Sequence, residues 1–498
     1  MASVDCDESP IVIRGRHRCA EKVVSPAVGR EAKRVAPRDM GSLSSLMDGG
    51  LLSFSRRGRI CRGRCQVSAR VLSSEMAGFE GKRVRVEGWV HRIRDLGGVR
   101  FLSVRDRSGL AQVVVPGEID ISGVGCECVI RVDGISRSEP RAPGGVEVLA
   151  SRVDVVARAE LPPLEVYKPL SVSRPRLDTL LDNRAVSLRI PEVLDIFRVQ
   201  AEIVKCFRSY LDSQDFVEIN TPKLVLAGAE GGAALFEVDY FEQTAYLAQS
   251  PQFYKQIMVG SGLERVYEVG HAYRAEKSET SRHITEFVSL DFEIGFIEDE
   301  QDLMQMLSEV IRYMFSEVRR VCAAELERME VTLPQLTEIP QISYLEAETL
   351  LREKFGKSEG INGDLDTEGE RLIGEWAAKE HGNEFVFVTG YAMEKRPVYA
   401  LAHEEFPEYS RSFDLLYRGV EIVTGGQRIH DYGQLVVALR NAGLDPTDYR
   451  GYLAAFKYGM PPHGGMGMGL ERLTKQMLGL SNIKEACLFP RDRYRLTP

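Results

Sequence analysis

One stretch, residues 265–293, constrains the fold more than any other part of the chain. It reads RVYEVGHAYRAEKSETSRHITEFVSLDFE. Apolar and polar residues alternate around Val266–Tyr273 and again around Ile284–Glu293, with a polar segment between the two runs. Such alternation predicts two strands of a long antiparallel hairpin. The charged turn, which includes Arg274 and Arg282, has two interpretations. It is a solvated tip, or a rigid platform whose arginine forks hold the phosphates of a nucleotide.

Length and composition bound the class of protein. A chain of 498 residues with 44% hydrophobic and 28% charged residues predicts two to four globular domains. Its longest apolar runs fall short of the ~18–20 residues of a membrane span, so we expect no membrane partner. The nine cysteines are scattered, which is typical of a reducing cytoplasm and predicts a cytoplasmic protein. A net charge of −9 argues against a globally basic nucleic-acid binder but allows a local basic face.

Residues 1–64 are rich in Arg, Ser and Gly and lack periodicity. Three interpretations compete: a disordered basic arm, a targeting peptide, or a gene start placed too far upstream. A transit peptide should be poor in acidic residues, whereas this segment contains five between Asp5 and Glu31. We therefore expect a disordered extension or a false start.

Residues 65–158 predict a small all-β domain. Five short alternating or apolar runs are separated by Gly-rich turns, at the spacing of an oligonucleotide-binding (OB) barrel. The runs are Val84–Val90, Val99–Arg105, Ala111–Val115, Glu127–Ile135 and Val146–Val155. Such a barrel binds single-stranded nucleic acid by stacking bases on aromatic rings in a basic groove. A plain barrel with a charged surface is the alternative. The proline-rich residues 159–180 indicate a linker.

Residues 181–498 contain two further signals. Residues 192–214 have a helical apolar period, and a short strand at 216–219 and Thr221-Pro222 follow. Near the C-terminus, the Gly-rich segment Lys457–Arg472 leads into a predicted helix over Leu470–Leu478, without the Gly-Lys-Ser/Thr of a P-loop. Taken singly, neither signal identifies a function.

Taken together, these segments resemble a known family. RAEKSETSRHITEF resembles motif 2 of class II aminoacyl-tRNA synthetases in the aspartyl form, and GWVHRIRDLGGVRFLSVRDRSGLAQVV resembles their anticodon-binding domain. Residues 192–222 resemble motif 1 and residues 457–480 resemble motif 3. The resemblance covers nearly all of residues 65–498. It implies an α+β protein: an OB-fold barrel before an antiparallel-sheet catalytic domain flanked by helices, an insertion over about 330–395, and a homodimer.

The resemblance also implies ATP-dependent attachment of aspartate to tRNA through an aspartyl-adenylate. Positioning and electrostatics dominate such a reaction. Arg274 would bind the α-phosphate and Arg472 the γ-phosphate, and these two are the expected catalytic residues. His283 is expected to position rather than to act as a general base. The expected ATP-binding set is Arg274, Ala275, Glu276, Arg282, His283, Ile284, Phe287, Glu421, Gly469, Leu470, Glu471 and Arg472.

By the same resemblance, Glu421 and Thr424 would hold Mg²⁺, which takes oxygen ligands. The family more often has Ser at the place of Thr424. Lys255 and Arg428 would clamp the side-chain carboxylate of aspartate, and Glu230 would bind its ammonium. Each of these charges alone is an ordinary surface residue; their joint match indicates a site. The expected aspartate-binding set is Glu230, Gln252, Phe253, Tyr254, Lys255, Arg274, Thr424 and Arg428.

Two positions bear on the choice of tRNA. Enzymes of this type that charge both tRNA(Asp) and tRNA(Asn) tend to have His at the place of His91 and Pro at the place of Pro143, as this chain does. The resemblance therefore predicts a non-discriminating enzyme whose aspartyl-tRNA(Asn) a separate amidotransferase amidates. Phe101 would stack on an anticodon base, and Gln112 and Glu147 would bind anticodon edges.

Three alternatives remain open: a strictly discriminating aspartyl enzyme, an asparaginyl enzyme, and a synthetase-like protein that no longer charges tRNA. Lys255 argues against an amide substrate, which would leave cations unpaired in a dry pocket. An asparagine synthetase of this kind usually lacks the barrel. A non-catalytic RNA-binding subunit should have lost Arg274, Glu421 or Arg472, and the chain retains all three.

Overall fold

The computed structural model describes residues 69–173, 175–226, 228, 235–360 and 362–497. Its first part is a closed five-stranded barrel with strand order β1-β2-β3-β5-β4. Alternate residues such as Val86, Leu102 and Val132 fill its interior and are fully buried. The predicted OB-type barrel is confirmed. The strands are β1 (Arg83–Asp95), β2 (Val99–Asp106), β3 (Gly109–Pro116), β4 (Val129–Ser138) and β5 (Val146–Ala157), with the short helices η1 (Ser73–Phe79) and η2 (Pro143–Gly145) beside them.

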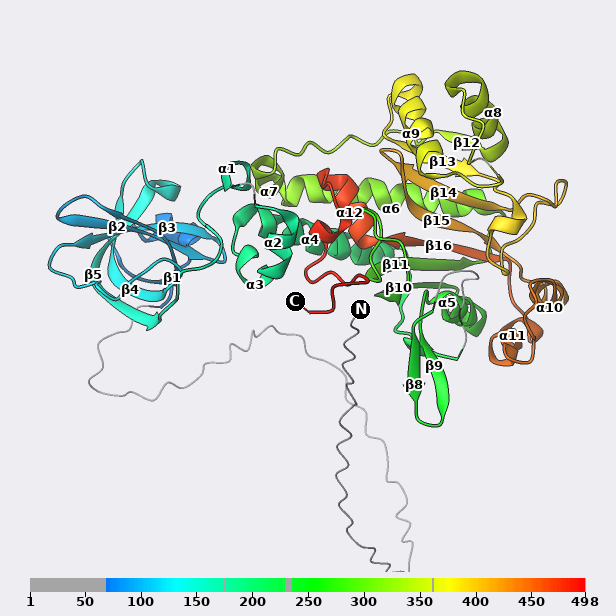
Figure 1. Ribbon diagram of the computed structural model, residues 1–498, viewed down its shortest axis with the longest axis horizontal. Helices are drawn as coiled ribbons and strands as arrows, with labels where there is room; N and C mark the ends of the chain where they lie inside the picture. Colours follow the sequence, from blue (N-terminus) through cyan, green and yellow to red (C-terminus); the bar gives the residue numbers. More distant parts are fainter. Residues whose placement is uncertain (1–68, 174, 227, 229–234, 361, 498) are drawn as a thin grey trace, which may run out of the picture. The chain divides into compact units, whose positions relative to one another are not determined.

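The second part is built on an eight-stranded sheet with the order β12-β13-β14-β15-β16-β11-β10-β6 (Figure 1). The β6–β10 and β12–β13 pairs are parallel and the other neighbours are antiparallel. The predicted hairpin is present as β10 and β11, in which Val266 lies opposite Glu293. The strands are β6 (Val217–Glu218), β10 (Arg265–Tyr273), β11 (Glu286–Gly295), β12 (Gln341–Ser343), β13 (Phe385–Thr389), β14 (Ser412–Tyr417), β15 (Val420–Arg428) and β16 (His463–Gly469).

Helices α4 (Pro191–Ser213), α6 (Glu300–Val321) and α12 (Leu470–Leu478) bury their apolar sides with one face of this sheet. Alternation on β11 turns Leu290 and Phe292 into that core, so Ser289, Asp291 and Glu293 face the other way. Helix α6 begins where the Asp299 side chain accepts a hydrogen bond from the Gln301 amide, an N-cap that satisfies a free donor. The helices predicted over 192–214 and 470–478 are confirmed.

Glycines in β16 make room for buried side chains on the polar face of the sheet. A Cβ on Gly465 would come 2.2 Å from a carboxylate oxygen of Glu293, so a side chain there would displace that carboxylate. Glycine lets the two strands approach and leaves room for a buried charged group between them. This sheet face carries the candidate site.

Residues 330–395, expected as an insertion, contribute β12 and β13 to the main sheet. Helices α8 (Tyr344–Phe355) and α9 (Thr367–His381) pack against those strands around Leu351, Ile373 and Val388. A separate three-stranded sheet has the order β7-β9-β8. Its strands are β7 (Leu224–Val225), β8 (Glu237–Tyr240) and β9 (Gln243–Leu247).

The remaining helices have at most 10 residues each. In the part of the chain that the structure describes, no helix is long and apolar enough to cross a membrane. These remaining helices are α1 (Leu170–Ser173), α2 (Leu177–Asp182), α3 (Arg184–Ser187), α5 (Gln252–Met258), η3 (Val259–Leu263), α7 (Ala323–Arg328), η4 (Met393–Lys395), α10 (Tyr432–Asn441), α11 (Arg450–Lys457) and η5 (Ile483–Ala486).

Candidate active site

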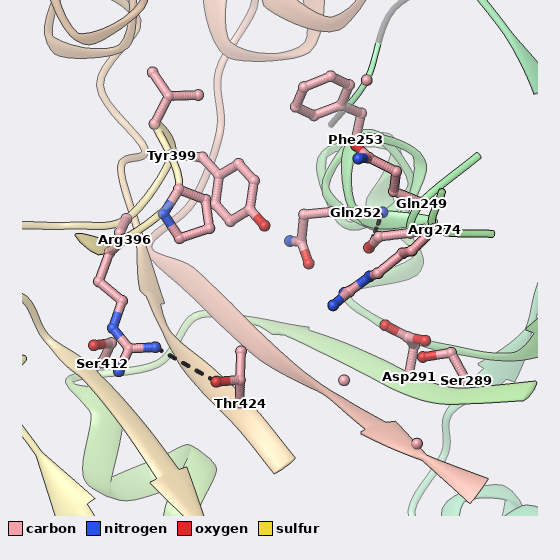
Figure 2. Close-up of a pocket in the computed structure, with 18 of the residues that line it drawn as sticks. Gln249, Gln252, Phe253, Arg274, Ser289, Asp291, Arg396, Tyr399, Ser412 and Thr424 are labelled. Carbon is pink, nitrogen blue, oxygen red and sulfur yellow. Dashed lines mark hydrogen bonds between the residues drawn. The ribbon is translucent and has the colours of Figure 1, made fainter. Parts of the chain in front are cut away.

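A cleft of about 1430 Å³ lies over the polar face of the large sheet, with walls from β11, β15, β16, α5 and the loops after β10 and β13. Figure 2 shows Gln252 and Arg274 directed into the space between Arg396 on one side and Asp291 on the other. The volume exceeds the ~300–1,000 Å³ of an ordinary small-molecule pocket. It therefore has room for two substrates side by side.

One end of the cleft is built on a buried cluster of opposite charges. Lys255 of α5 is fully buried, and its Nζ lies 2.9 Å from Asp291 Oδ1 and 3.5 Å from Glu293 Oε2. Arg428, at the end of β15, places its Nε 3.2 Å from Glu293 Oε1. Gln252 donates to both oxygens of Glu293 at 3.1 Å. The cluster thus holds two cations and two carboxylates in fixed positions.

The electrostatics of this cluster follow from burial and pairing. Burial alone would raise the pKa of the Glu293 carboxyl, but Arg428 and Lys255 reverse that effect and hold the pKa below its usual value. Asp291 Oδ2 is buried and has no hydrogen-bond partner among the described residues. Because an unpaired buried acceptor is costly, this oxygen is suited to a donor that a ligand brings, such as an ammonium group.

Arg274, just after β10, lies at the middle of the cleft. Its guanidinium carbon lies 5.5 Å from the centre of the Phe287 ring, and its main-chain N–H donates to Thr285. Its buried Nε finds no acceptor within the described ranges. A stacked arginine with an unsatisfied donor is a ready ligand for a carboxylate or phosphate oxygen.

At the other end of the cleft, Arg472 of α12 contacts Glu421 of β15. Arg472 Nη1 donates to the main-chain oxygen of Glu421 at 2.9 Å and to its carboxylate at 3.2 Å. Burial raises the pKa of the Glu421 carboxyl, an effect that Arg472 partly offsets. Burial likewise raises the pKa of Glu471, whose carboxyl accepts from the Val288 amide, to about 7. Cations brought to this end would stabilise the ionised carboxylates.

Thr424 of β15 lines the cleft and is part of a second polar group. Its hydroxyl donates to Asp414 and lies 3.5 Å from Arg396 Nη1 (Figure 2). Arg396 forms an ion pair with Asp414 at 2.9 Å and stacks on Tyr391, 3.9 Å from the ring centre. One further lone pair of the Thr424 oxygen is left for a ligand.

Most of the predicted substrate-binding residues line the cleft, but four do not: Tyr254, Lys255, Ala275 and Leu470. Lys255 instead forms an ion pair with Asp291, which lines the cleft. Glu230 lies outside the described residues. The predicted residues that line the cleft are Gln252, Phe253, Arg274, Glu276, Arg282, His283, Ile284, Phe287, Glu421, Thr424, Arg428, Gly469, Glu471 and Arg472; their roles stay predictions.

Several lining residues were not predicted. Asp291 and Ser289 alternate with the apolar residues of β11, and this polar alternation inside a strand expected to be central was the signal that could have identified them. Many of the others come from irregular segments or from the ends of strands, where no periodic pattern marks a site. They include Gln249, Arg396, Tyr399 and Ser412.

Four of the five barrel residues predicted to contact tRNA lie on strands, and Pro143 lies in η2. Gln112 of β3 donates to Glu147 of β5 at 2.8 Å, and Phe101 lies on β2 beside them, partly exposed. His91 lies at an irregularity of β1, with Nδ1 2.9 Å from Arg105. Burial and this arginine lower the pKa of His91. Pro143 begins η2 and is exposed.

An OB-type barrel joined to a mostly antiparallel sheet with an arginine-lined cleft is the architecture expected of class II tRNA synthetases. The family described as tRNA synthetases class II (D, K and N) matches residues 176–493, and the OB-fold nucleic acid binding domain matches residues 84–156. The chain belongs to the class II tRNA synthetases (D, K and N).

Individual relatives show which members of this family the chain is similar to. The chain is 48% identical over 431 residues to Aspartate--tRNA(Asp/Asn) ligase of Thermus thermophilus, covering 86% of this chain and 100% of the relative. It is 44% identical to Aspartate--tRNA(Asp) ligase of Thermococcus kodakarensis, covering 84% and 97%. Among solved structures, asparaginyl-tRNA synthetase of Pyrococcus horikoshii with asparaginyl-adenylate matches with a TM-score of 0.81 and 33% identity, covering 86% of this chain and 100% of that one.

Proposed function

We propose that this enzyme uses ATP to attach L-aspartate to tRNA(Asp) and tRNA(Asn) through an aspartyl-adenylate. The observation that carries the proposal is the juxtaposition of unsatisfied groups of opposite sign in one cleft. Asp291 Oδ2 is a buried acceptor and Arg274 Nε a buried donor, while the Arg428 guanidinium also lines the cleft. An amino acid that carries an ammonium, an α-carboxylate and a second carboxylate complements this arrangement.

The two ends of the cleft then bind different parts of the substrates. Arg428, fixed by Glu293, binds the side-chain carboxylate, and Lys255 keeps Asp291 and Glu293 in place. Arg274 binds the α-carboxylate and the α-phosphate as the one attacks the other, where negative charge develops. Arg472 and Arg282 bind the outer phosphates, so that pyrophosphate leaves toward them. Glu230 is proposed as an ammonium ligand from the resemblance alone.

Mg²⁺ fits the Arg472 end of the cleft. Glu421 presents a carboxylate whose ionised form burial disfavours, and Thr424 has a lone pair to spare. Mg²⁺ usually takes one or two protein ligands and shares the rest with phosphates, which suits this sparse donor set. When bound, the ion would neutralise charge on the phosphates.

The choice of tRNA is proposed from His91 and Pro143. The relatives divide between ligases named for tRNA(Asp/Asn) and ligases named for tRNA(Asp), so these marker positions decide the proposal. A relaxed enzyme requires a separate amidotransferase as the next enzyme for aspartyl-tRNA(Asn). We also propose a homodimer formed through the motif 1 region, in which Leu194 and Val217 are exposed apolar residues. Cytoplasmic localisation stays a prediction.

An asparaginyl enzyme is the second candidate, favoured by the fold match to an asparaginyl-tRNA synthetase. The structure weakens one argument against it, because Asp291 and Glu293 already balance Lys255. Pyrophosphate exchange with ATP separates the two. We expect exchange with aspartate and less than about one hundredth of that rate with asparagine, since a wrong polar partner costs several kcal/mol. Faster exchange with asparagine would support the second candidate.

A further inference from the structure

Glu370, in the first turns of α9, connects two parts of the cleft that are far apart in the sequence. Its Oε2 accepts a hydrogen bond from the main-chain N–H of Glu421 at 3.0 Å and one from Arg282 Nη1 at 3.2 Å. Arg282 belongs to the loop between β10 and β11, and Glu421 belongs to β15. One carboxylate oxygen therefore ties the phosphate-binding loop to the strand that carries the proposed metal ligand.

The position of Glu370 is fixed by unusually close packing. One turn further along α9, a Cβ on Gly374 would lie 2.5 Å from main-chain atoms of Gly419. Gly419, in the turn between β14 and β15, has a φ of +68°, which a residue with a side chain rarely adopts. Residues 370 and 374 lie on one side of the helix, and Glu421 follows Gly419 by two residues. This glycine contact holds the Glu370 carboxylate against β15.

Arg282 is only partly covered, with 21% of its side chain exposed, and it extends from an irregular loop. Long side chains in such loops lose considerable rotamer freedom when they are held in one place. Besides Glu370, its Nη1 reaches the Thr367 hydroxyl at 3.3 Å. A guanidinium has five N–H donors, so Arg282 can keep its contact with α9 and still donate to a phosphate.

We propose that Glu370 is a positioning residue for ATP: it holds Arg282 at the place where the outer phosphates of the nucleotide bind. This proposal rests on the proposed function. Burial and the nearby Glu421 carboxylate raise the pKa of Glu370, whereas Arg282 and Arg472 attract its ionised form. Glu370 touches neither substrate and acts through Arg282.

The test compares Glu370→Gln with Glu368→Gln, a matched control on the same helix whose carboxylate is exposed and pairs with Lys357. In Glu370→Gln, the amide side chain still has an oxygen for the Glu421 main-chain N–H but lacks the charge for Arg282. We expect Glu370→Gln to raise the KM for ATP in pyrophosphate exchange about tenfold, as for one charged hydrogen bond. The KM for aspartate and kcat should change less than about threefold, and Glu368→Gln should behave as wild type.

A double-mutant cycle separates positioning from a structural role. Arg282→Ala, on the loop, should raise the KM for ATP at least as much as Glu370→Gln, and the double variant should match Arg282→Ala within about threefold. Additive effects, an unchanged KM in Arg282→Ala, or equal losses for both substrates in Glu370→Gln would overturn the proposal. A wild-type enzyme without aspartate-dependent exchange would instead contradict the proposed function.

Discussion

Replacing Arg428 by leucine should reduce aspartate-dependent pyrophosphate exchange by about 10²–10³-fold, the effect expected when one partner of a buried charge pair is truncated. Arg428 is nearly fully buried, with contacts to Glu293 and to the main-chain oxygen of Gly465 at 3.0 Å. The substitution Arg428→Leu would remove the proposed clamp for the substrate carboxylate. Glu293 would retain Gln252 and Lys255 as partners, so the fold should survive.

Binding of tRNA in the absence of aspartate should stay within about threefold of wild type in this variant, because distant sites act independently. Arg440→Leu is the matched control, since Arg440 is exposed on α10, and it should keep full exchange activity. Filter binding and thermal denaturation should accompany the kinetics. If Arg428→Leu retains exchange, or if it loses exchange and tRNA binding together, the assignment of the clamp is wrong.

The second large effect is expected for Arg274→Lys. A lysine keeps the charge but lacks the planar fork that contacts two oxygens at once. Removing one preorganised donor to a developing charge costs about 10²–10³-fold in kcat. The loss should appear mainly in kcat for exchange, because Arg274 is proposed to act on the reacting groups. Burst measurements of adenylate formation would report this step directly.

Arg265→Lys provides the control for that substitution. Arg265 lies at the start of the same strand, β10, where it donates to the main-chain oxygen of Gln214 at 3.1 Å. It does not line the cleft, so its replacement should leave kcat within about threefold of wild type. If Arg274→Lys raised KM and left kcat unchanged, the arginine would bind substrate and transition state equally well.

The fold was largely predictable because its main elements have strong local patterns. The β10–β11 hairpin, the barrel strands, α4 and α12 all lie within a few residues of where periodicity placed them. The roles of β12 and β13 were not predictable, because a three-residue and a five-residue strand leave almost no periodic signal. Their membership of the large sheet depends on pairing between distant segments.

The candidate site likewise contains residues that the local sequence could identify and residues that it could not. Arg274, Arg428 and Arg472 stand in distinctive strings of residues, whereas Glu370 lies on an amphipathic helix where an acidic residue usually indicates a solvated face. Arg396 reaches the cleft from an irregular loop, and only the tertiary fold brings it to Asp414. The full burial of Lys255 was equally beyond local patterns, since a buried lysine depends on partners that other segments supply.

The most direct measurement is aspartylation of purified tRNA(Asp) and tRNA(Asn) transcripts, assayed side by side with the full-length enzyme. We expect both to be charged with aspartate at rates within about tenfold of each other, a difference of less than ~1.4 kcal/mol in transition-state binding. Charging of tRNA(Asp) alone would contradict the role given to His91 and Pro143, and charging of neither tRNA would contradict the proposed function itself.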